Sequence, residues 1–439
     1  NIVANRLNRQ LDLGGPSCTV SLEERSGLEA LGIAARALRR RELDAALVGA
    51  VDMSCEPVHV AASRECLGVS ERKVSGDAAV AMVLKRLDDA LRDGDQVYAV
   101  LGSEDEDTSQ KSALDFGPSS KIGSLEHRFG HAHAASGLLH VSAAALSLYH
   151  RQRPDGRPWL SSRTRTARVA VGAMGGAESI WTLTEHVEST GHNAGPTPSF
   201  YVYEGGSGEE VLAALDTGKT SALTSLGTGA RLVIVACDDD VLGRRIERAR
   251  AHIRGGAPAG EGVHYRAAQV MGDLAFVFTS AGSAYHGMGE ELLAMLPELG
   301  DRLGRRFDGL ADAMGWVFED PERAATNDQR LWGASCLSQM HAELTRGLLG
   351  IQPDAAIGYS SGESNSLFAL GAWTDMDAMR REIDESALYT TELAGPFEAV
   401  ARAWATEDQR QIKVAKTAEV HWSVWSLLAP VDRIRELVS

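Results

Sequence analysis

Short apolar segments alternate with segments of helical periodicity along almost the whole chain. Strand patterns occur at 45–51, 78–84, 96–100, 166–172, 180–184, 200–203, 231–236 and 273–278. Apolar residues recur at helical spacing at 28–38, 132–149, 240–253 and 288–295. Such alternation is typical of α/β layers, in which strands and helices pack in turn, and it favours largely parallel sheets. We therefore expect an α/β protein.

Two stretches rich in Gly, Pro and small residues divide the chain into three zones. They lie at 188–198 and 255–262, and such composition is typical of connections between packed units. We predict domains at 1–186, 187–266 and 267–439, which we call the first, middle and last zones. A chain of 439 residues is long enough for two to three domains at roughly 100–200 residues each.

The balance of charged residues limits the classes of partner. Lys and Arg total 44 against 60 Asp and Glu, so the net charge is −16 and no nucleic-acid surface is expected. No apolar run approaches the ~20 residues of a membrane span. Scattered cysteines without a C-x-x-C pair indicate reduced thiols, and we expect a cytoplasmic protein without a metal site. They are Cys18, Cys55, Cys66, Cys237 and Cys336.

The last zone contains a motif typical of serine nucleophiles. Residues 358–362 read Gly-Tyr-Ser-Ser-Gly between a short apolar strand and a helix, which is the G-x-S-x-G pattern of a nucleophile elbow. Ser360 is the candidate nucleophile, and the helix N-terminus with the Ser361 amide can stabilise an oxyanion. Ala281, in the turn after the strand at 273–278, is the candidate for a second amide donor. The alternative is an idle serine that only caps the helix.

These residues resemble the malonyl/acyltransferase domains of fatty acid and polyketide synthases. Those domains carry Gly-His-Ser-x-Gly-Glu at the elbow, where Tyr359 replaces the histidine, and Pro-Gly-Gln-Gly-Ser-Gln after the first strand. The resemblance implies an acyltransferase (α/β-hydrolase-like) fold with Ser360 as nucleophile. Glu385 falls where the family places the arginine that binds the malonyl carboxylate, so an uncharged acyl group is expected. The family's general-base histidine is not matched, since only His421 follows Ser360.

The first zone contains a second family pattern. Residues 14–21 read Gly-Gly-Pro-Ser-Cys-Thr-Val-Ser and resemble the ketosynthase signature Gly-Pro-Ser-x-Thr-Val-Asp-Thr-Ala-Cys. Alignment without gaps puts Glu24 at the condensing cysteine, where a helix N-terminus would stabilise a thiolate. Residues 121–126 resemble Asn-Ile-Gly-His-Leu-Glu, with Ser124 in place of the catalytic histidine. The other catalytic histidine, in His-Gly-Thr-Gly-Thr, has no counterpart. Cys18 is expected to be a buried residue on the preceding strand.

A ketosynthase-like region without its catalytic residues is what chain-length factors look like. The order of zones resembles the large subunit of bacterial polyunsaturated fatty acid synthases; heterocyst-glycolipid and enediyne synthases are related. The resemblance implies a thiolase-like layered first zone, a small α/β linker domain and an acyltransferase. It also implies pairing with a ketosynthase domain and acyl carrier protein as a partner. The substrates would be acyl-CoA or other acyl thioesters, carried by CoA or phosphopantetheine, with no bound cofactor.

Several features leave alternatives open. The chain could be a non-catalytic scaffold, or a serine hydrolase acting on thioesters. His127, His131 and His133 are expected at a surface or interface rather than at a metal. The basic cluster at 36–41 is either a solvated helix end or a docking site for an acidic carrier protein. We also expect further sequence before residue 1, within 101–120 and after residue 439.

Overall fold

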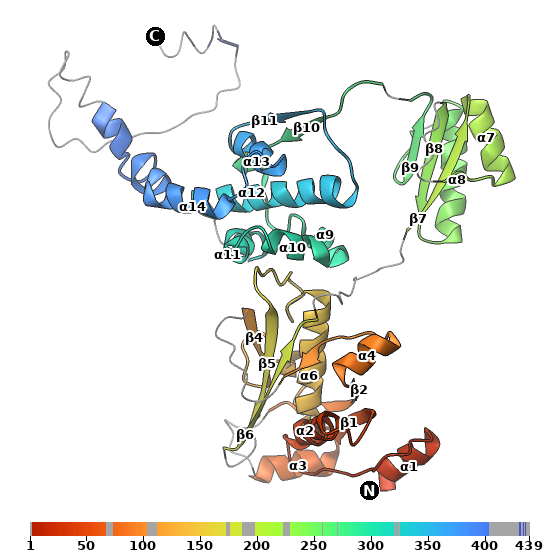
Figure 1. Ribbon diagram of the computed structural model, residues 1–439, viewed down its shortest axis with the longest axis vertical. Coiled ribbons are helices and arrows are strands. Elements are labelled where there is room, and N and C mark those ends of the chain that lie inside the picture. Colours follow the sequence, from red (N-terminus) through yellow and green to blue (C-terminus); the bar gives the residue numbers. More distant parts are fainter. Residues whose placement is uncertain are drawn as a thin grey trace.

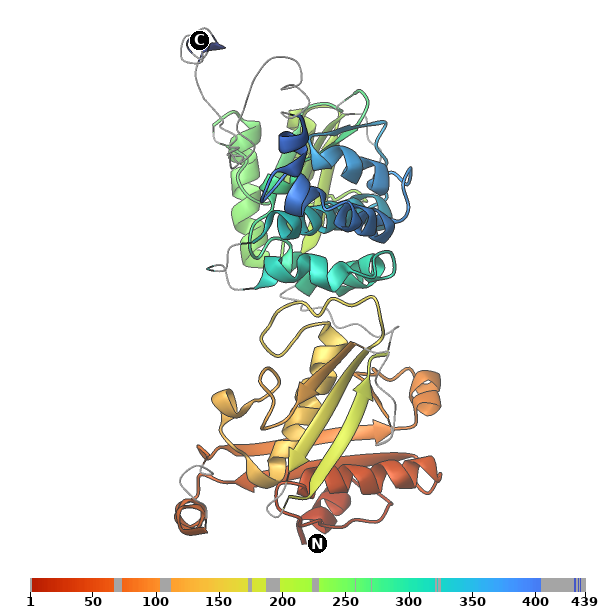
Figure 2. The same cartoon turned by 90° about the vertical axis from the view of Figure 1, so that its left-hand side faces the viewer.

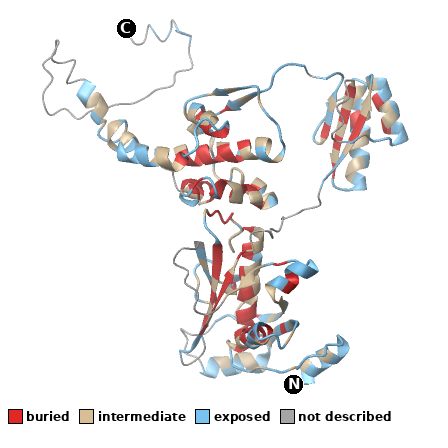
Figure 3. Ribbon diagram, viewed as in Figure 1, coloured by how far each residue is buried: buried red, intermediate tan, exposed pale blue. Residues whose placement is uncertain are grey.

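The computed structural model confirms the α/β class. It describes residues 2–66, 73–102, 112–172, 176–186, 198–222, 229–256, 258–269, 271–319 and 325–403, with a few isolated positions besides. The first zone forms one body and the last zone a second, while the strands and helices of the middle zone form a small separate unit (Figure 1). Buried residues concentrate on the central helix of each large zone and on the strands beside it (Figure 3). The expected boundary at 188–198 lies almost entirely outside the described residues.

The first zone is built around one long buried helix, α6. Its elements are α1 (Ile2–Gln10), α2 (Ser26–Arg39), β1 (Ala45–Met53), α3 (Pro57–Cys66), β2 (Asp77–Lys85), α4 (Leu87–Asp93), β3 (Val100–Leu101), β4 (Ser112–Phe116), α5 (Glu126–Phe129), α6 (His133–His150), β5 (Arg165–Gly172) and β6 (Glu178–Thr184). Helix α6 packs against α2, β1 and β2 on one side and β5 on another. Leu28, Leu138 and Trp181 are fully or almost fully buried there and form part of one core.

The sheets are mostly antiparallel, so the expectation of largely parallel sheets was wrong. β1 pairs with β2 antiparallel, and the four-stranded sheet has the order β3-β6-β5-β4. Only β4–β5 and β10–β11 are parallel among the described strands. For β5 and β6 the connection accounts for the direction, because residues 173–177 are too few for the crossover that parallel neighbours need. The predicted strand at 96–100 is also reduced to the two residues of β3.

One face of the β1–β2 sheet is exposed. Leu47, Val51, Met53 and Val83 all lie on this exposed face. The period of two along each strand turns alternate residues toward α6, where Val48 is buried.

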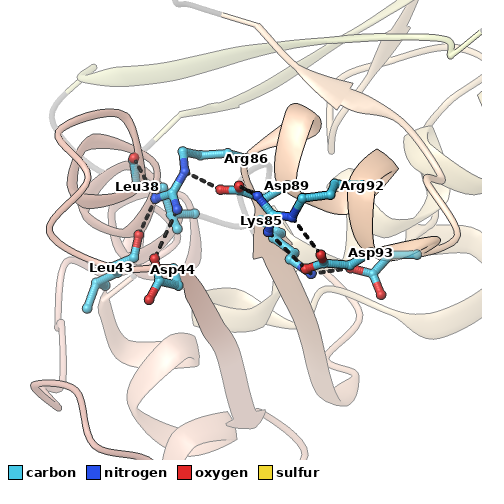
Figure 4. A network of polar contacts seen from close by, with 9 residues as sticks. Leu38, Leu43, Asp44, Lys85, Arg86, Asp89, Arg92 and Asp93 are labelled. Atoms are coloured by element: carbon cyan, nitrogen blue, oxygen red, sulfur yellow. Dashed lines mark hydrogen bonds and ion pairs between the residues drawn. The ribbon is translucent and has the colours of Figure 1, made fainter.

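A network of charges fastens the end of α2 to β1, β2 and α4. The Arg86 guanidinium donates to the carbonyls of Leu38 and Leu43 and pairs with Asp44 and Asp89 (Figure 4). Carbonyls at a helix C-terminus lack partners within the helix, so a cation there satisfies them. The basic cluster at 36–41 is therefore a helix end followed by a turn, at which Arg86 adds a further charge.

The middle zone is a three-stranded antiparallel sheet with two helices. Its elements are β7 (Ser199–Gly205), α7 (Gly208–Thr217), β8 (Ala230–Ala236), α8 (Asp239–Ile253) and β9 (Val263–Arg266), with strand order β7-β8-β9. Both helices begin at side-chain caps, since Ser207 accepts from the Glu210 amide and Asp238 from the Val241 amide. Leu232 and Ile234 are completely buried in its core.

The last zone places one parallel strand pair beside a group of helices. Its elements are β10 (Ala275–Phe278), η2 (Ala281–Ser283), α9 (Glu290–Met295), α10 (Pro297–Gly304), α11 (Leu310–Gly315), η3 (Trp316–Phe318), α12 (Asn327–Ala342), η4 (Glu343–Leu348), β11 (Ala355–Gly358), α13 (Ser361–Ala369), α14 (Met376–Glu385) and η5 (Leu388–Glu392). Helix α12 begins at a capping box of Thr326 and Gln329. Trp332 and Met340 of α12 are buried in the core of this zone.

The first and last zones meet at helix α10. The loop that follows α6 lies directly below this helix (Figure 2), and Leu160 joins the core of the last zone. The backbone approaches so closely that a β-carbon at Gly304 would overlap the carbonyl oxygen of Ser161. A buried ion network crosses the contact, because Asp301 of α10 pairs with both Arg151 and Arg165, which also pair with Glu185. These contacts join the two zones directly, without the middle zone.

Candidate functional site

Ser360 lies at a sharp turn between β11 and α13. Its backbone has φ 55° and ψ −125°, a left-handed conformation that non-glycine residues rarely adopt. The residue is exposed, and its side chain makes no capping hydrogen bond to α13. The structure thus confirms the strand–turn–helix context that the motif predicts, and it shows no capping role for this hydroxyl.

The two glycines of the motif are required by the close approach of the neighbouring chain. A β-carbon at Gly358 would overlap the amide of Glu363, and one at Gly362 would overlap the carbonyl oxygen of Phe278. Phe278 ends the parallel partner strand β10, and its carbonyl also accepts from the Tyr359 amide at 3.0 Å. The elbow is therefore held against the end of β10.

Replacing Gly362 with alanine should destabilise the protein. Because the new methyl group would displace backbone rather than a flexible side chain, we expect a loss of about 1–3 kcal/mol in the free energy of unfolding. Chemical denaturation measures the change. Gly243→Ala is the matched control, since that glycine lies inside α8 with no atom near its β-carbon position and should give no loss. Equal stability of Gly362→Ala and wild type would contradict the packing of the elbow.

The candidate oxyanion donors lie at the same end of the two strands. Ala281 begins the short helix η2 directly after β10, and Ser361 begins α13 directly after the elbow. The Thr279 hydroxyl bonds Ser283 at 2.7 Å and so fixes the turn that carries Ala281. Amides in the first turn of a helix have no acceptor within that helix. The two predicted amide donors thus follow the ends of two paired strands, β10 and β11.

The other predicted residues of the last zone do not surround Ser360. Glu385 is the exposed last residue of α14, and the described residues show no hydrogen bond or ion pair between it and the elbow. Tyr359 is exposed beside the nucleophile. Within the described ranges no histidine is hydrogen-bonded to Ser360, and His421 lies outside them.

A buried polar group behind the elbow was not predicted. Gln339 of α12 is completely buried and donates from Nε2 to the carbonyl of Asn365 at 2.9 Å. Asn365 is itself 2% exposed and lies one helical turn from Ser361. This contact fastens α13 to α12. In the sequence, only the four-residue spacing of Ser361 and Asn365 indicated that the two residues share one face of the helix after the elbow.

The far end of α13 is capped by arginines. Arg306 and Arg346 donate to the carbonyls of Phe368 and Ala369, and they line a cavity of about 320 Å³ together with Glu343. Cations at a helix C-terminus satisfy its free carbonyls and complement its dipole. These guanidinium groups therefore serve as a helix cap.

Glu24 lies at the N-terminus of α2, where the ketosynthase pattern places a thiol. The helix begins at Ser26, and Glu24 Oε1 lies 3.3 Å from Nε2 of His131. The pKa of the Glu24 carboxyl is lowered, chiefly by this hydrogen bond, with the charges of His133 and Lys73 adding to the effect. No cysteine of the described residues stands at this helix start.

His131 is part of this site and lies partly buried between segments. Its side chain is only 11% exposed, and Nδ1 lies 2.8 Å from Glu126 Oε1, which pairs with Lys73 Nζ at 2.7 Å. Ser124, predicted to replace the catalytic histidine, instead places its hydroxyl 3.4 Å from the Glu126 amide. The available signal was the Gly-His pair at 130–131, which repeats part of the motif sought at 121–126.

The buried cysteine is not the one that the sequence predicts. Cys18 is exposed and lies in no strand, so its expected burial was wrong. Cys336 is the buried one, and burial raises its pKa to about 12.

In the part of the chain that is described, no three His, Cys, Asp or Glu side chains are placed to hold a metal. No helix there is long and apolar enough to cross a bilayer.

Residues 1–90 match the family of the beta-ketoacyl synthase N-terminal domain. The chain is 24% identical to the highly reducing polyketide synthase sphB of Aspergillus fumigatus, covering 93% of this chain and 20% of that protein. It is 26% identical to the lovastatin diketide synthase lovF of Aspergillus terreus, covering 86% of this chain and 20% of that protein. A mycocerosic acid synthase-like polyketide synthase of Mycobacterium tuberculosis is 25% identical, covering 88% and 24%. The chain spans about a fifth to a quarter of the length of these relatives.

Two ketosynthase structures align with part of the chain. The ketosynthase domain OzmH KS7 for oxazolomycin, from Streptomyces albus JA3453, gives a TM-score of 0.37 at 18% identity over 62% of this chain and 66% of that one. The ketosynthase of module 6 of the bacillaene synthase from Bacillus subtilis 168 gives a TM-score of 0.37 at 18% identity, over 61% of this chain and 64% of that one. The N-terminal part of the chain is thus ketosynthase-like, as the pattern at 14–21 predicted, by its match to the domain family.

Proposed function

We propose that this chain is an acyl-transferring section of a multidomain synthase of the polyketide type, with Ser360 as the nucleophile. The observation that carries the proposal is the left-handed backbone of an exposed serine between β11 and α13. Strain of this kind persists where the surrounding structure maintains it, and it is concentrated at functional sites. The similarity of most of the chain to polyketide synthases supports acyl thioesters as the substrate class.

The proposed reaction has two half-reactions. The Ser360 oxygen attacks the thioester carbonyl, a carbon–oxygen bond forms, and the carbon–sulfur bond breaks to release a thiol. The amides of Ser361 and Ala281 bind the oxygen of the tetrahedral intermediate, where negative charge develops. An acceptor thiol then attacks the acyl-serine and regenerates the hydroxyl. The thiols belong to CoA or to the phosphopantetheine of an acyl carrier protein, which is the proposed partner.

The acyl group is proposed to be uncharged. A malonyl carboxylate needs a cation to bind it, and the family's arginine position aligns with Glu385 in this chain. A glutamate at the aligned position supplies no cation for it.

The first zone is proposed to act as a chain-length factor that pairs with a ketosynthase. Glu24 supports this, because a carboxylate at the start of α2 cannot supply the thiolate that condensation needs. The order of a ketosynthase-like zone before an acyltransferase-like zone further supports a place in a polyunsaturated fatty acid synthase.

Partition between transfer and hydrolysis tests the activity of the last zone. The full chain is mixed with an acyl N-acetylcysteamine thioester and an excess of pantetheine, and both products are quantified by mass spectrometry. After subtraction of the amounts formed with Ser360→Ala, we expect acyl-pantetheine to exceed the free acid at early times, because the acceptor thiol takes the acyl group from Ser360. Free acid alone would show a serine hydrolase. The absence of both products would indicate a scaffold without this activity.

A further inference from the structure

Four charged or titratable side chains from separate segments meet at the start of α2. Glu24 precedes α2, Lys73 precedes β2, Glu126 begins α5, and His131 precedes α6. They form one chain of contacts: Glu24 to His131 at 3.3 Å, His131 to Glu126 at 2.8 Å, and Glu126 to Lys73 at 2.7 Å. None of them takes part in the chemistry proposed for Ser360. We call this group the Glu24–His131 site.

The contacts give each group a defined position. Both ring nitrogens of His131 face carboxylate oxygens, so the ring is held at two points. Glu126 is held in turn by Lys73. A titratable group whose partner is oriented by a third group is the arrangement of acid–base sites.

One atom of the site has no partner. Glu24 Oε2 is buried and accepts no hydrogen bond from any described residue, whereas Oε1 faces His131. An unsatisfied carboxylate oxygen inside a protein is unfavourable and is unusual outside functional sites. Oε2 is therefore the oxygen of Glu24 that no other described group engages.

The surroundings favour negative charge on a bound molecule. Helix α2 has 14 residues, and its first-turn amides and positive dipole end lie beside Glu24. His133 also lies close, with its ring 6.2 Å from that of His131 and Nδ1 3.7 Å from Asp52. A developing enolate oxygen at the start of α2 would lie near these amides, while the carboxylates of Glu126 and Asp52 are already in contact with Lys73 and His133. A carboxylate can remove a proton next to a carbonyl when the enolate is stabilised in this way.

We propose that the Glu24–His131 site exchanges the proton next to the thioester carbonyl of 3-oxoacyl thioesters, without forming a carbon–carbon bond. Glu24 Oε2 takes the proton, the carbon–hydrogen bond breaks, and its electron pair delocalises onto the oxygens of the enolate. Reprotonation by the same carboxyl restores the thioester, so no other reactant is consumed. The proposal rests on the proposed function only in taking acyl thioesters as substrates.

Isotope washout tests this activity in the full chain. The probe is an N-acetylcysteamine thioester of a 2-methyl-3-oxoacyl group that carries deuterium at C2. The loss of this deuterium into water is followed by mass spectrometry and compared with a protein-free blank. We expect wild type to exceed the blank. Glu24→Gln should reduce the excess rate by about 10²–10⁴-fold, because an amide cannot accept the proton. Glu23→Gln, at the exposed neighbouring residue, should keep the wild-type rate.

The readout separates this proposal from the Ser360 chemistry. Ser360→Ala should lose acyl loading and keep the washout, while Glu24→Gln should keep acyl loading and its thermal transition. Wild type no faster than the blank, or Glu24→Gln as fast as wild type, would overturn the proposal. Washout in a protein that shows no acyl loading would support it while contradicting the proposed function.

Discussion

Replacing Ser360 with alanine is expected to abolish the acyl-enzyme while leaving the protein folded. The full chain is exposed to an acyl thioester, and the mass added to the intact protein is measured. Removing the nucleophile removes the covalent step, so the loading rate should fall by at least about 10³-fold. The serine is exposed and its side chain makes no capping bond, so its loss should change stability little.

Two serines of the same helix provide the controls. Ser364→Ala should load like wild type, because this residue lies a turn further along α13. Ser361→Ala keeps the backbone amide that binds the oxyanion and should also still load. Undiminished loading of Ser360→Ala would remove this residue from the reaction. Loss of loading in Ser361→Ala with retention in Ser360→Ala would move the nucleophile by one residue.

Replacing Asp301 with alanine is expected to give the largest loss of stability. Arg151 and Arg165 are almost fully buried, and Asp301 is one of the two carboxylates that pair with them. Without it, two buried guanidinium groups share Glu185 alone. Breaking a buried ion network by removing one partner costs about 3–5 kcal/mol, because it leaves an uncompensated charge.

Chemical denaturation followed by tryptophan fluorescence measures this loss. The eight tryptophans lie in the first and last zones, so the transition that they report should shift to lower denaturant concentration if the network joins those zones. Asp312→Ala is the control, since this aspartate of α11 is exposed and should change stability by no more than about 0.5 kcal/mol. A loss below about 1 kcal/mol in Asp301→Ala would show that the network does not hold the zones together.

The sequence allowed the elbow to be predicted because its requirements are local. A strand, two glycines, a serine and a helix follow one another within 355–369, and each has its own signature in the residues. The same holds for α6 and α8, whose periodicity alone placed them within a residue or so. Sheet direction was wrong because periodicity shows that a strand exists but not which strand pairs with it.

The contacts that assemble the Glu24–His131 site and the ion network could not be predicted in this way. Glu24 and His131 are 107 residues apart, and Arg151 and Asp301 are 150 apart. Neither pair leaves a pattern in the local sequence. The alignment of 121–126 to the ketosynthase motif placed Ser124, and not His131, at the position of the catalytic histidine. Tertiary packing of α6 against α2 brings His131 to Glu24.

Identifying the residue that carries a serine-directed label is the most direct test of the central claim. The folded full chain is treated with a fluorophosphonate, digested, and the modified residue is located by tandem mass spectrometry. We predict one adduct, on Ser360, that is absent from Ser360→Ala and slowed by prior addition of an acyl thioester. A folded protein that takes no label, or that takes it on a different serine, would contradict the assignment of the elbow as an acyl-transfer site.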